Sequence, residues 1–288
     1  MLSTGARSVS PKHEENAARD AVDLSRHEPM QRDRGDQACN AFRSPQGNGG
    51  ESIVRPLVTI IALGLIWLGA ARMPASAKSR YVTAGVLSAA LIGWVAVAQY
   101  LGVANTYFAA ADTAVPTVLF GLLLPLAVAA IALWRSESIA RLVSAIPLHW
   151  LVAAQVYRVA GGIFLVLWAD GRLPWQFALP AGIGDVATGG VAVVVAALLA
   201  QNAIGAHRAT YAWCLFGIAD LVVAITMGAM TSPGPAHLLA FDAPNLLISS
   251  YPLVMVPTFA VPLALMLHGL VLWRLRRGAA STERLAAA

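Results

Sequence analysis

The chain has 288 residues, of which 58% are apolar and 12% are charged, and its mean hydropathy is +0.65. A soluble domain carries about a quarter charged residues, so this composition excludes a disordered protein, a coiled coil and an ordinary soluble enzyme. Residues 53–288 hold 13 basic and seven acidic side chains, a net charge of +6. The sequence therefore predicts an integral membrane protein.

Residues 1–52 differ from the rest because they are polar throughout and hold 15 of the 35 charges. They lack the short apolar core of a secretory signal, and they show no hydrophobic periodicity. We expect a disordered N-terminal tail, within which Met30 could serve as a later initiation site. The two cysteines, Cys39 in this tail and Cys214 in an apolar run, form neither a disulfide framework nor a metal motif.

Seven stretches approach or exceed the roughly 20 apolar residues that a helix needs to cross a bilayer. They predict an all-α bundle of seven transmembrane helices over residues 53–275, followed by a basic tail over 276–288. The predicted spans are 56–72, 81–104, 115–134, 146–169, 177–200, 210–230 and 247–273. The segment between the third and fourth spans, 135–145, is predicted to form a short interfacial helix.

The basic side chains of the connections indicate an orientation, because Lys and Arg concentrate on the cytoplasmic side of a membrane. The connections after the first, third and fifth spans, with the C-terminus, carry ten, and the opposite connections carry only Arg172. We therefore expect a bacterial inner-membrane protein with its N-terminus outside and its C-terminus in the cytoplasm. The ten are Arg72, Lys78, Arg80, Arg135, Arg141, Arg208, Arg274, Arg276, Arg277 and Arg284.

Three ionisable residues lie deep in the predicted spans, and such residues are by default candidates for function. At 1.5 Å per residue, Arg158 and Asp220 lie about 15 Å deep and Asp185 about 12 Å deep. We expect Arg158 to pair with one or both carboxylates, since an unpaired guanidinium in hydrocarbon is costly. Two acids beside one base leave an excess negative charge, so one carboxyl could exchange a proton. A purely structural ion pair is the alternative.

Polar neighbours extend this predicted centre. Gln155 and Tyr157 lie on or beside the helix face of Arg158. Three prolines in the seventh predicted span each free a carbonyl one turn earlier, which favours a kinked helix beside a hydrated cavity. His149 and His268 are predicted near the cytoplasmic ends of their helices, and we expect neither a haem nor any other cofactor or metal. The prolines are Pro252, Pro257 and Pro262.

The sequence Gly182-Ile183-Gly184-Asp185 is similar to the G-x-G-D motif of presenilin-like and prepilin-type intramembrane aspartyl proteases. In those families the motif aspartate shares a proton with a second intramembrane aspartate. Asp220 is deep enough for that role but follows the motif instead of preceding it. Arg158 would hold both carboxylates ionised, which disfavours a proton-sharing pair.

A broader set of residues resembles a family of bacterial multi-pass membrane proteins with no assigned activity. It consists of Gln155, Tyr157-Arg158, Gly161-Gly162, Leu173-Pro174 and the run Pro180–Asp185. The resemblance implies a polytopic membrane protein and transfers no catalytic residue. We therefore expect a protein, more plausibly not an enzyme, that moves or senses a small solute or a proton. Its polar centre would be Arg158, Asp185, Asp220, Gln155 and Tyr157, with an aspartyl protease using Asp185 and Asp220 as the alternative.

The sequence also indicates which partners to expect. They are the lipid bilayer and an unidentified small solute or proton, and a homo-oligomer is compatible with the sequence. No basic face interleaved with aromatic residues is visible, so no nucleic acid is expected.

Overall fold

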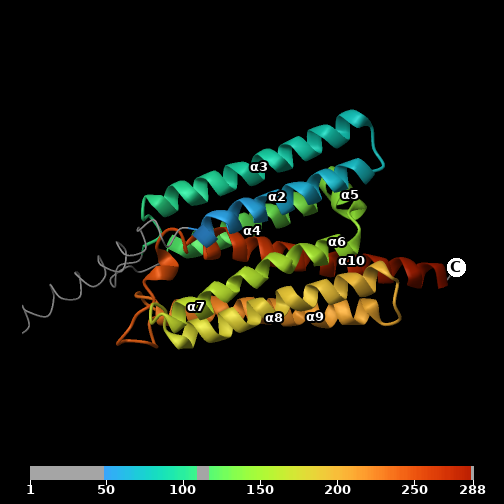
Figure 1. Ribbon diagram of the computed structural model, residues 1–288. Coiled ribbons are helices and arrows are strands. Elements are labelled where there is room, and N and C mark those ends of the chain that lie inside the picture. Colours follow the sequence, from blue (N-terminus) through green and yellow to red (C-terminus); the bar gives the residue numbers. More distant parts are fainter. Residues whose placement is uncertain (1–48, 109–116, 287–288) are drawn as a thin grey trace, which may run out of the picture. The chain divides into compact units, whose positions relative to one another are not determined.

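The computed structural model describes residues 49–108 and 117–286, and these residues form helices, turns and short connections with no β-strand among them. Within these ranges, seven helical segments are long and apolar enough to cross a membrane. They run alternately up and down in one helical unit (Figure 1). The predicted all-α bundle of seven helices is confirmed, whereas most of the predicted N-terminal tail lies outside the described residues.

The observed spans follow the apolar stretches of the sequence, and the first six agree with the predicted ones to within four residues at each end. The long helices are α2 (Gly49–Arg72), α3 (Ala77–Val103), α4 (Thr117–Arg135), α8 (Trp175–Ala200), α9 (Ala206–Thr231) and α10 (Val261–Ala286). The agreement reflects a local property, because each run is about as long as the bilayer core is thick.

The fourth span is less regular than the sequence predicts. It consists of α6 (Leu148–Ala153), the 3₁₀ segment η1 (Ala154–Gly162) and α7 (Ile163–Ala169). The 3₁₀ winding is narrower than an α-helix, and long stretches of it are uncommon. Here it lies against α8 so closely that a Cβ on Gly189 would stand 2.7 Å from the backbone nitrogen of Val159.

The seventh span begins nine residues later than predicted, at Val256 instead of Leu247. Residues 247–255 form the short 3₁₀ turn η2 (Leu247–Ser249) and further turns. The Ser250 hydroxyl donates to the Leu246 carbonyl, and Pro252 has no N–H to give a helix. The span then opens with a π-helical turn, η3 (Val256–Ala260), before α10.

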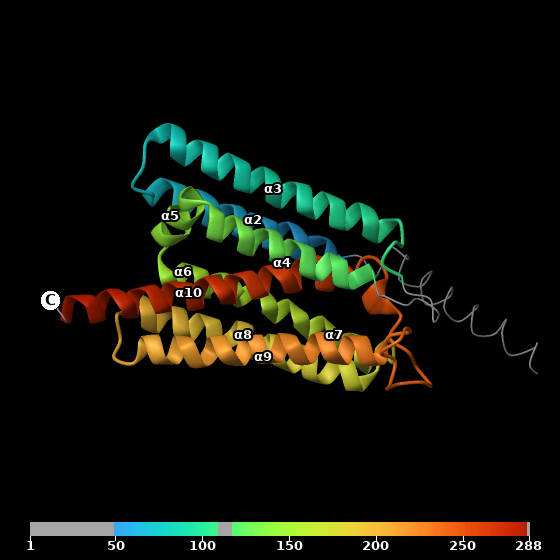
Figure 2. The same ribbon diagram turned by 180° about the vertical axis from the view of Figure 1, so that it is seen from behind.

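The segment between α4 and the fourth span forms the predicted helix, α5 (Glu137–Ala145), whose N-cap Ser136 accepts from the Ile139 N–H. Arg274 of α10 donates to the carbonyls of Val143 and Ile146 at 2.9 and 2.7 Å, satisfying groups at the end of α5. In Figures 1 and 2, α5 lies at the same end of the unit as the α2–α3 and α8–α9 connections and the C-terminus. The arginine-bearing connections therefore share one end.

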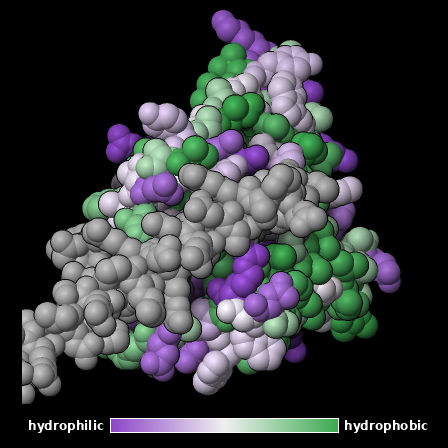
Figure 3. Space-filling view, turned by 60° about the vertical axis from the view of Figure 1, so that its left-hand side comes forward, coloured by the Kyte–Doolittle hydropathy of each residue, from purple (hydrophilic) through white to green (hydrophobic). Residues whose placement is uncertain are grey.

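Large apolar side chains cover the flanks of the helical unit, as expected for surfaces that face lipid. Figure 3 shows broad hydrophobic areas beside the polar residues of the connections. On α4, exposed side chains include Phe120, Leu124 and Ile131, each more than half exposed. Among the long helices, the buried apolar core instead draws residues from α2, α3, α8, α9 and α10.

Candidate functional site

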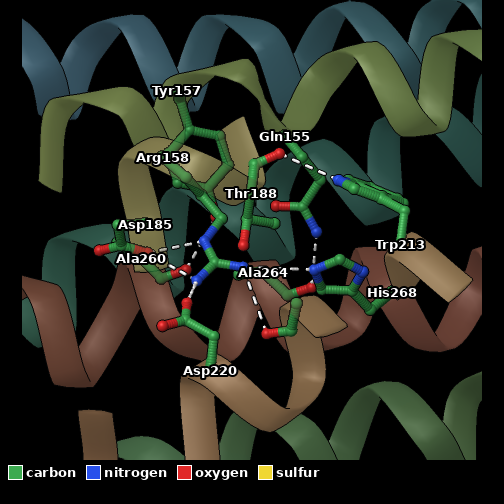
Figure 4. Close-up of polar contacts among 11 residues, drawn as sticks. Gln155, Tyr157, Arg158, Asp185, Thr188, Trp213, Asp220, Ala260, Ala264 and His268 are labelled. Atoms are coloured by element: carbon green, nitrogen blue, oxygen red, sulfur yellow. Dashed lines mark hydrogen bonds and ion pairs between the residues drawn. The ribbon is translucent and has the colours of Figure 1, made fainter. Parts of the chain in front are cut away.

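Arg158 lies in the middle of η1 and contacts both intramembrane carboxylates. Its Nε donates to Asp185 Oδ1 at 2.7 Å, and its NH2 lies 2.6 Å from the same oxygen. The same NH2 also donates to Asp220 Oδ2. The three side chains thus come from three different segments, η1, α8 and α9, and meet at one guanidinium (Figure 4). The expected ion pairing of Arg158 is present, and both carboxylates take part.

The remaining guanidinium nitrogen faces two further acceptors. NH1 lies 3.3 Å from the Gly217 carbonyl oxygen and 3.4 Å from His268 Nε2. The Arg158 side chain has five N–H groups, and these contacts give each of them an acceptor. Only 3% of Arg158 is exposed and 9% of Asp220. With both carboxylates ionised and His268 neutral, the cluster holds one negative charge in excess.

His268 belongs to this cluster, which the sequence analysis did not predict. A seventh span that ends at Trp273, as the sequence predicts, places His268 near a helix end, whereas the observed span continues to Gly278. The histidine is fully buried in mid-span, and its ring packs 4.8 Å from that of Trp213. The arginines that follow Trp273 mark the predicted helix end, but the helix continues through them.

The contacts of His268 determine which ring nitrogen carries the proton. Arg158 can only donate, so Nε2 accepts and the proton lies on Nδ1. Nδ1 is 3.2 Å from Cys214 Sγ, which in turn donates to the His268 carbonyl at 3.3 Å. Both nitrogens of this imidazole are therefore engaged by protein groups. His149, the other histidine predicted near a helix end, lies at the start of α6 beside Trp150 and takes no part in these contacts.

Gln155 and Tyr157 lie in η1 with Arg158 but bind the backbone of the seventh span. Gln155 Nε2 donates to the Ala264 carbonyl at 3.0 Å, and the Tyr157 hydroxyl donates to the Ala260 carbonyl at 2.9 Å. They connect η1 to η3 and α10 and do not contact the guanidinium. The predicted polar centre is thus a charged cluster with two linking side chains beside it.

The carbonyl that Pro262 frees in the seventh span has a protein partner. Pro262 removes the N–H that would bond the carbonyl of Thr258, one turn earlier. Trp94 of α3 supplies the donor instead, with its indole Nε1 3.1 Å from that oxygen. The ring of Trp94 also packs edge-on against Phe259 at 5.0 Å.

Glycines allow the carboxylates to reach the guanidinium. A Cβ on Gly161 would collide with the Asp185 side chain, and a Cβ on Gly184 would collide with the Asp220 carboxylate. A Cβ on Gly217 would lie 2.5 Å from His268 Nε2. Small residues at these three points therefore make room for polar side chains between closely packed helices.

Within the described residues, no group of three or more His, Cys, Asp or Glu side chains is arranged to hold a metal ion. The arrangement can instead hold charges, donate and accept protons, and link segments that pack together. These features define a class: a multi-pass membrane protein of seven helices with a buried arginine–carboxylate cluster.

The chain belongs to the family described as a domain of unknown function (DUF8737), whose model matches residues 115–276. This range includes every residue of the cluster and begins before α4. No curated protein and no solved structure matches the chain.

Proposed function

We propose that this protein binds and releases a proton at the Arg158–Asp185–Asp220 cluster and uses that step to move or sense a small solute. The observation that carries the proposal is that two carboxylates meet one guanidinium nitrogen inside the bundle. An excess negative charge in such surroundings is costly, and a proton removes it without any change in packing. His268 Nε2, which accepts from Arg158, adds no positive charge while that contact lasts.

The contacts of Arg158 favour a proton over a direct solute anion. Each N–H of the guanidinium already faces an acceptor, so an anion would have to displace one. The second oxygens, Asp185 Oδ2 and Asp220 Oδ1, accept no hydrogen bond from the part of the chain that the structure describes. Either oxygen offers a lone pair to a proton.

An intramembrane aspartyl protease is a second candidate, favoured by the meeting of Asp185 and Asp220 at NH2 of Arg158. Such an enzyme needs the two carboxyls to share a proton. Arg158 occupies the place where they would meet, which makes this the weaker proposal. Cleavage of a synthetic apolar transmembrane peptide by the purified protein, lost in both Asp→Asn variants, would favour the protease.

Infrared difference spectroscopy of the reconstituted protein tests the proton proposal without knowledge of the solute. Acidification should produce the C=O stretch of a protonated carboxyl in the wild type. Both Asp185→Asn and Asp220→Asn should abolish that band, because the one carboxylate that remains is matched by the guanidinium. Asp170→Asn, at an exposed helix end, is the control and should retain it. If the band of the protonated carboxyl appears in the wild type and is still present in both cluster variants, the proposal is contradicted.

We further propose the orientation in a bacterial inner membrane: the C-terminus lies in the cytoplasm and the N-terminus outside. The support is the ten-to-one distribution of basic residues between the two sets of connections. Alkaline phosphatase fused after Arg277 should be inactive in a bacterial host, whereas the same enzyme fused after Ser232 should be active. The reverse pattern would overturn this orientation.

A further inference from the structure

Two polar atoms beside the charged cluster are fully enclosed by the protein. Gln155 Oε1 and Thr188 Oγ1 have no hydrogen-bond partner among the residues that the structure describes, and both residues are 0% exposed. A buried polar atom without a partner costs about 1–3 kcal/mol. Two such atoms on side chains beside the same cluster indicate that a further molecule belongs there.

Other atoms of the two side chains lie near residues that surround His268. Thr188 Cγ2 is 3.0 Å from the Cβ position of Gly217, and His268 Nε2 is 2.5 Å from the same position. Gln155 donates to the carbonyl of Ala264, one helical turn before His268. Figure 4 shows the Gln155 amide and the Thr188 hydroxyl on the same side of the Arg158 guanidinium.

We propose that a single water molecule binds between Gln155 Oε1 and Thr188 Oγ1, beside Arg158 NH1. The amide oxygen only accepts, so the bound molecule must donate to it. The hydroxyl can donate or accept, so it suits either end of a water molecule. The complete burial of both residues restricts the occupant to a very small molecule.

Arg158 supplies a third partner, and a buried water typically has about three. The two contacts of NH1, at 3.3 and 3.4 Å, are long beside the 2.6–2.7 Å contacts that the other two nitrogens make with Asp185. The N–H groups of a planar guanidinium cannot rotate, but a long contact allows one of them to be shared between its present acceptor and the water. Any use of this water to relay a proton to or from the cluster rests on the proposed function, whereas the binding of the water does not.

The effect of Thr188→Val on thermal unfolding in detergent distinguishes a bound water from a truly unpartnered atom. If the water is bound, the midpoint should fall by about 3–6 °C, because Gln155 Oε1 loses its bridge. If Thr188 Oγ1 has no partner, removal of a buried polar atom should raise the midpoint. Thr188→Ser, which keeps the hydroxyl, should lie closer to the wild type than Thr188→Val. Thr210→Val is the matched control, because that buried hydroxyl donates to its own helix at Ala206.

A double-mutant cycle completes the test. Gln155→Met should cost fewer degrees in the Thr188→Val background than in the wild type, since one water serves both side chains. The loss of the bond to Ala264 occurs in both backgrounds and cancels. A rise in the midpoint with Thr188→Val, or additive effects of the two substitutions, would overturn the water site. Because the readout is unfolding, failure here leaves the infrared test of proton binding unaffected.

Discussion

The three N-terminal spans and the four C-terminal spans bury different kinds of side chain. Among the described residues before Leu148, Thr83 is the only buried polar one, and α4 buries Leu122 alone. The four later spans bury an arginine, a histidine, an aspartate, a glutamine and several threonines. The family match, over 115–276, covers α4 and the four later spans except for the last two residues of the seventh.

This difference shows what gives a helical membrane protein a specific arrangement. Lipid is as apolar as a leucine side chain, so apolar contact alone hardly favours packing of a helix against another helix over packing against lipid. Polar contacts and the close approach of glycines are specific, and in the described residues they concentrate between η1, α8, α9 and α10. We therefore expect substitutions in the C-terminal spans to have the larger effects.

The largest effect is expected from Arg158→Ala, which leaves the buried Asp220 carboxylate and the partly buried Asp185 carboxylate without their cation. We expect a loss of about 3–5 kcal/mol in stability, seen as a low yield of folded protein and a lower unfolding midpoint in detergent. Asp220→Asn in the same chain should restore part of the loss by neutralising one carboxylate. The matched control is Arg80→Ala, whose guanidinium donates to the Ala70 carbonyl at a helix end. If both arginines matter equally, the contrast between the two regions is wrong.

A smaller effect is expected from Gly189→Ala, because its Cβ would stand 2.7 Å from the backbone nitrogen of Val159. The backbone cannot turn aside as a side chain can, so η1 must shift away from α8 at a cost of about 1–3 kcal/mol. At the adjacent Gly190 a Cβ would have no neighbour within 4 Å. Thermal unfolding should separate Gly189→Ala from a near-neutral Gly190→Ala, and equal midpoints would show that the two segments pack loosely.

The smallest effect concerns one of the contacts that join the two regions, the hydrogen bond from the Trp94 indole to the Thr258 carbonyl. Trp94→Phe keeps an aromatic ring against Phe259 but leaves that carbonyl without its donor. We expect a loss of about 1 kcal/mol in unfolding free energy. Trp134→Phe, at a residue that is 81% exposed, should change little. No difference between the two variants would mean that the proline-freed carbonyl finds another donor.

The number and position of the spans followed from the sequence because both depend on local length and composition. The start of the seventh span did not follow, since residues 247–255 are nearly as apolar as the helix that they precede. Their serines bond locally to the Leu246 carbonyl, and the helix begins only after Pro252. The sequence also did not predict the 3₁₀ conformation of η1, because that conformation accompanies the close contact with α8 and has no residue pattern of its own.

The sequence by itself determined that the chain crosses a membrane seven times and that Arg158 requires a buried partner, because both conclusions rest on the cost of moving groups out of water. Only the tertiary structure decided that both aspartates meet the same nitrogen and that His268 joins them. It also decided that Trp94 satisfies the carbonyl freed by Pro262. Such contacts join segments that are 27 to 164 residues apart. They depend on the rotation and closeness of packed helices, and hydropathy along the chain carries no information about either.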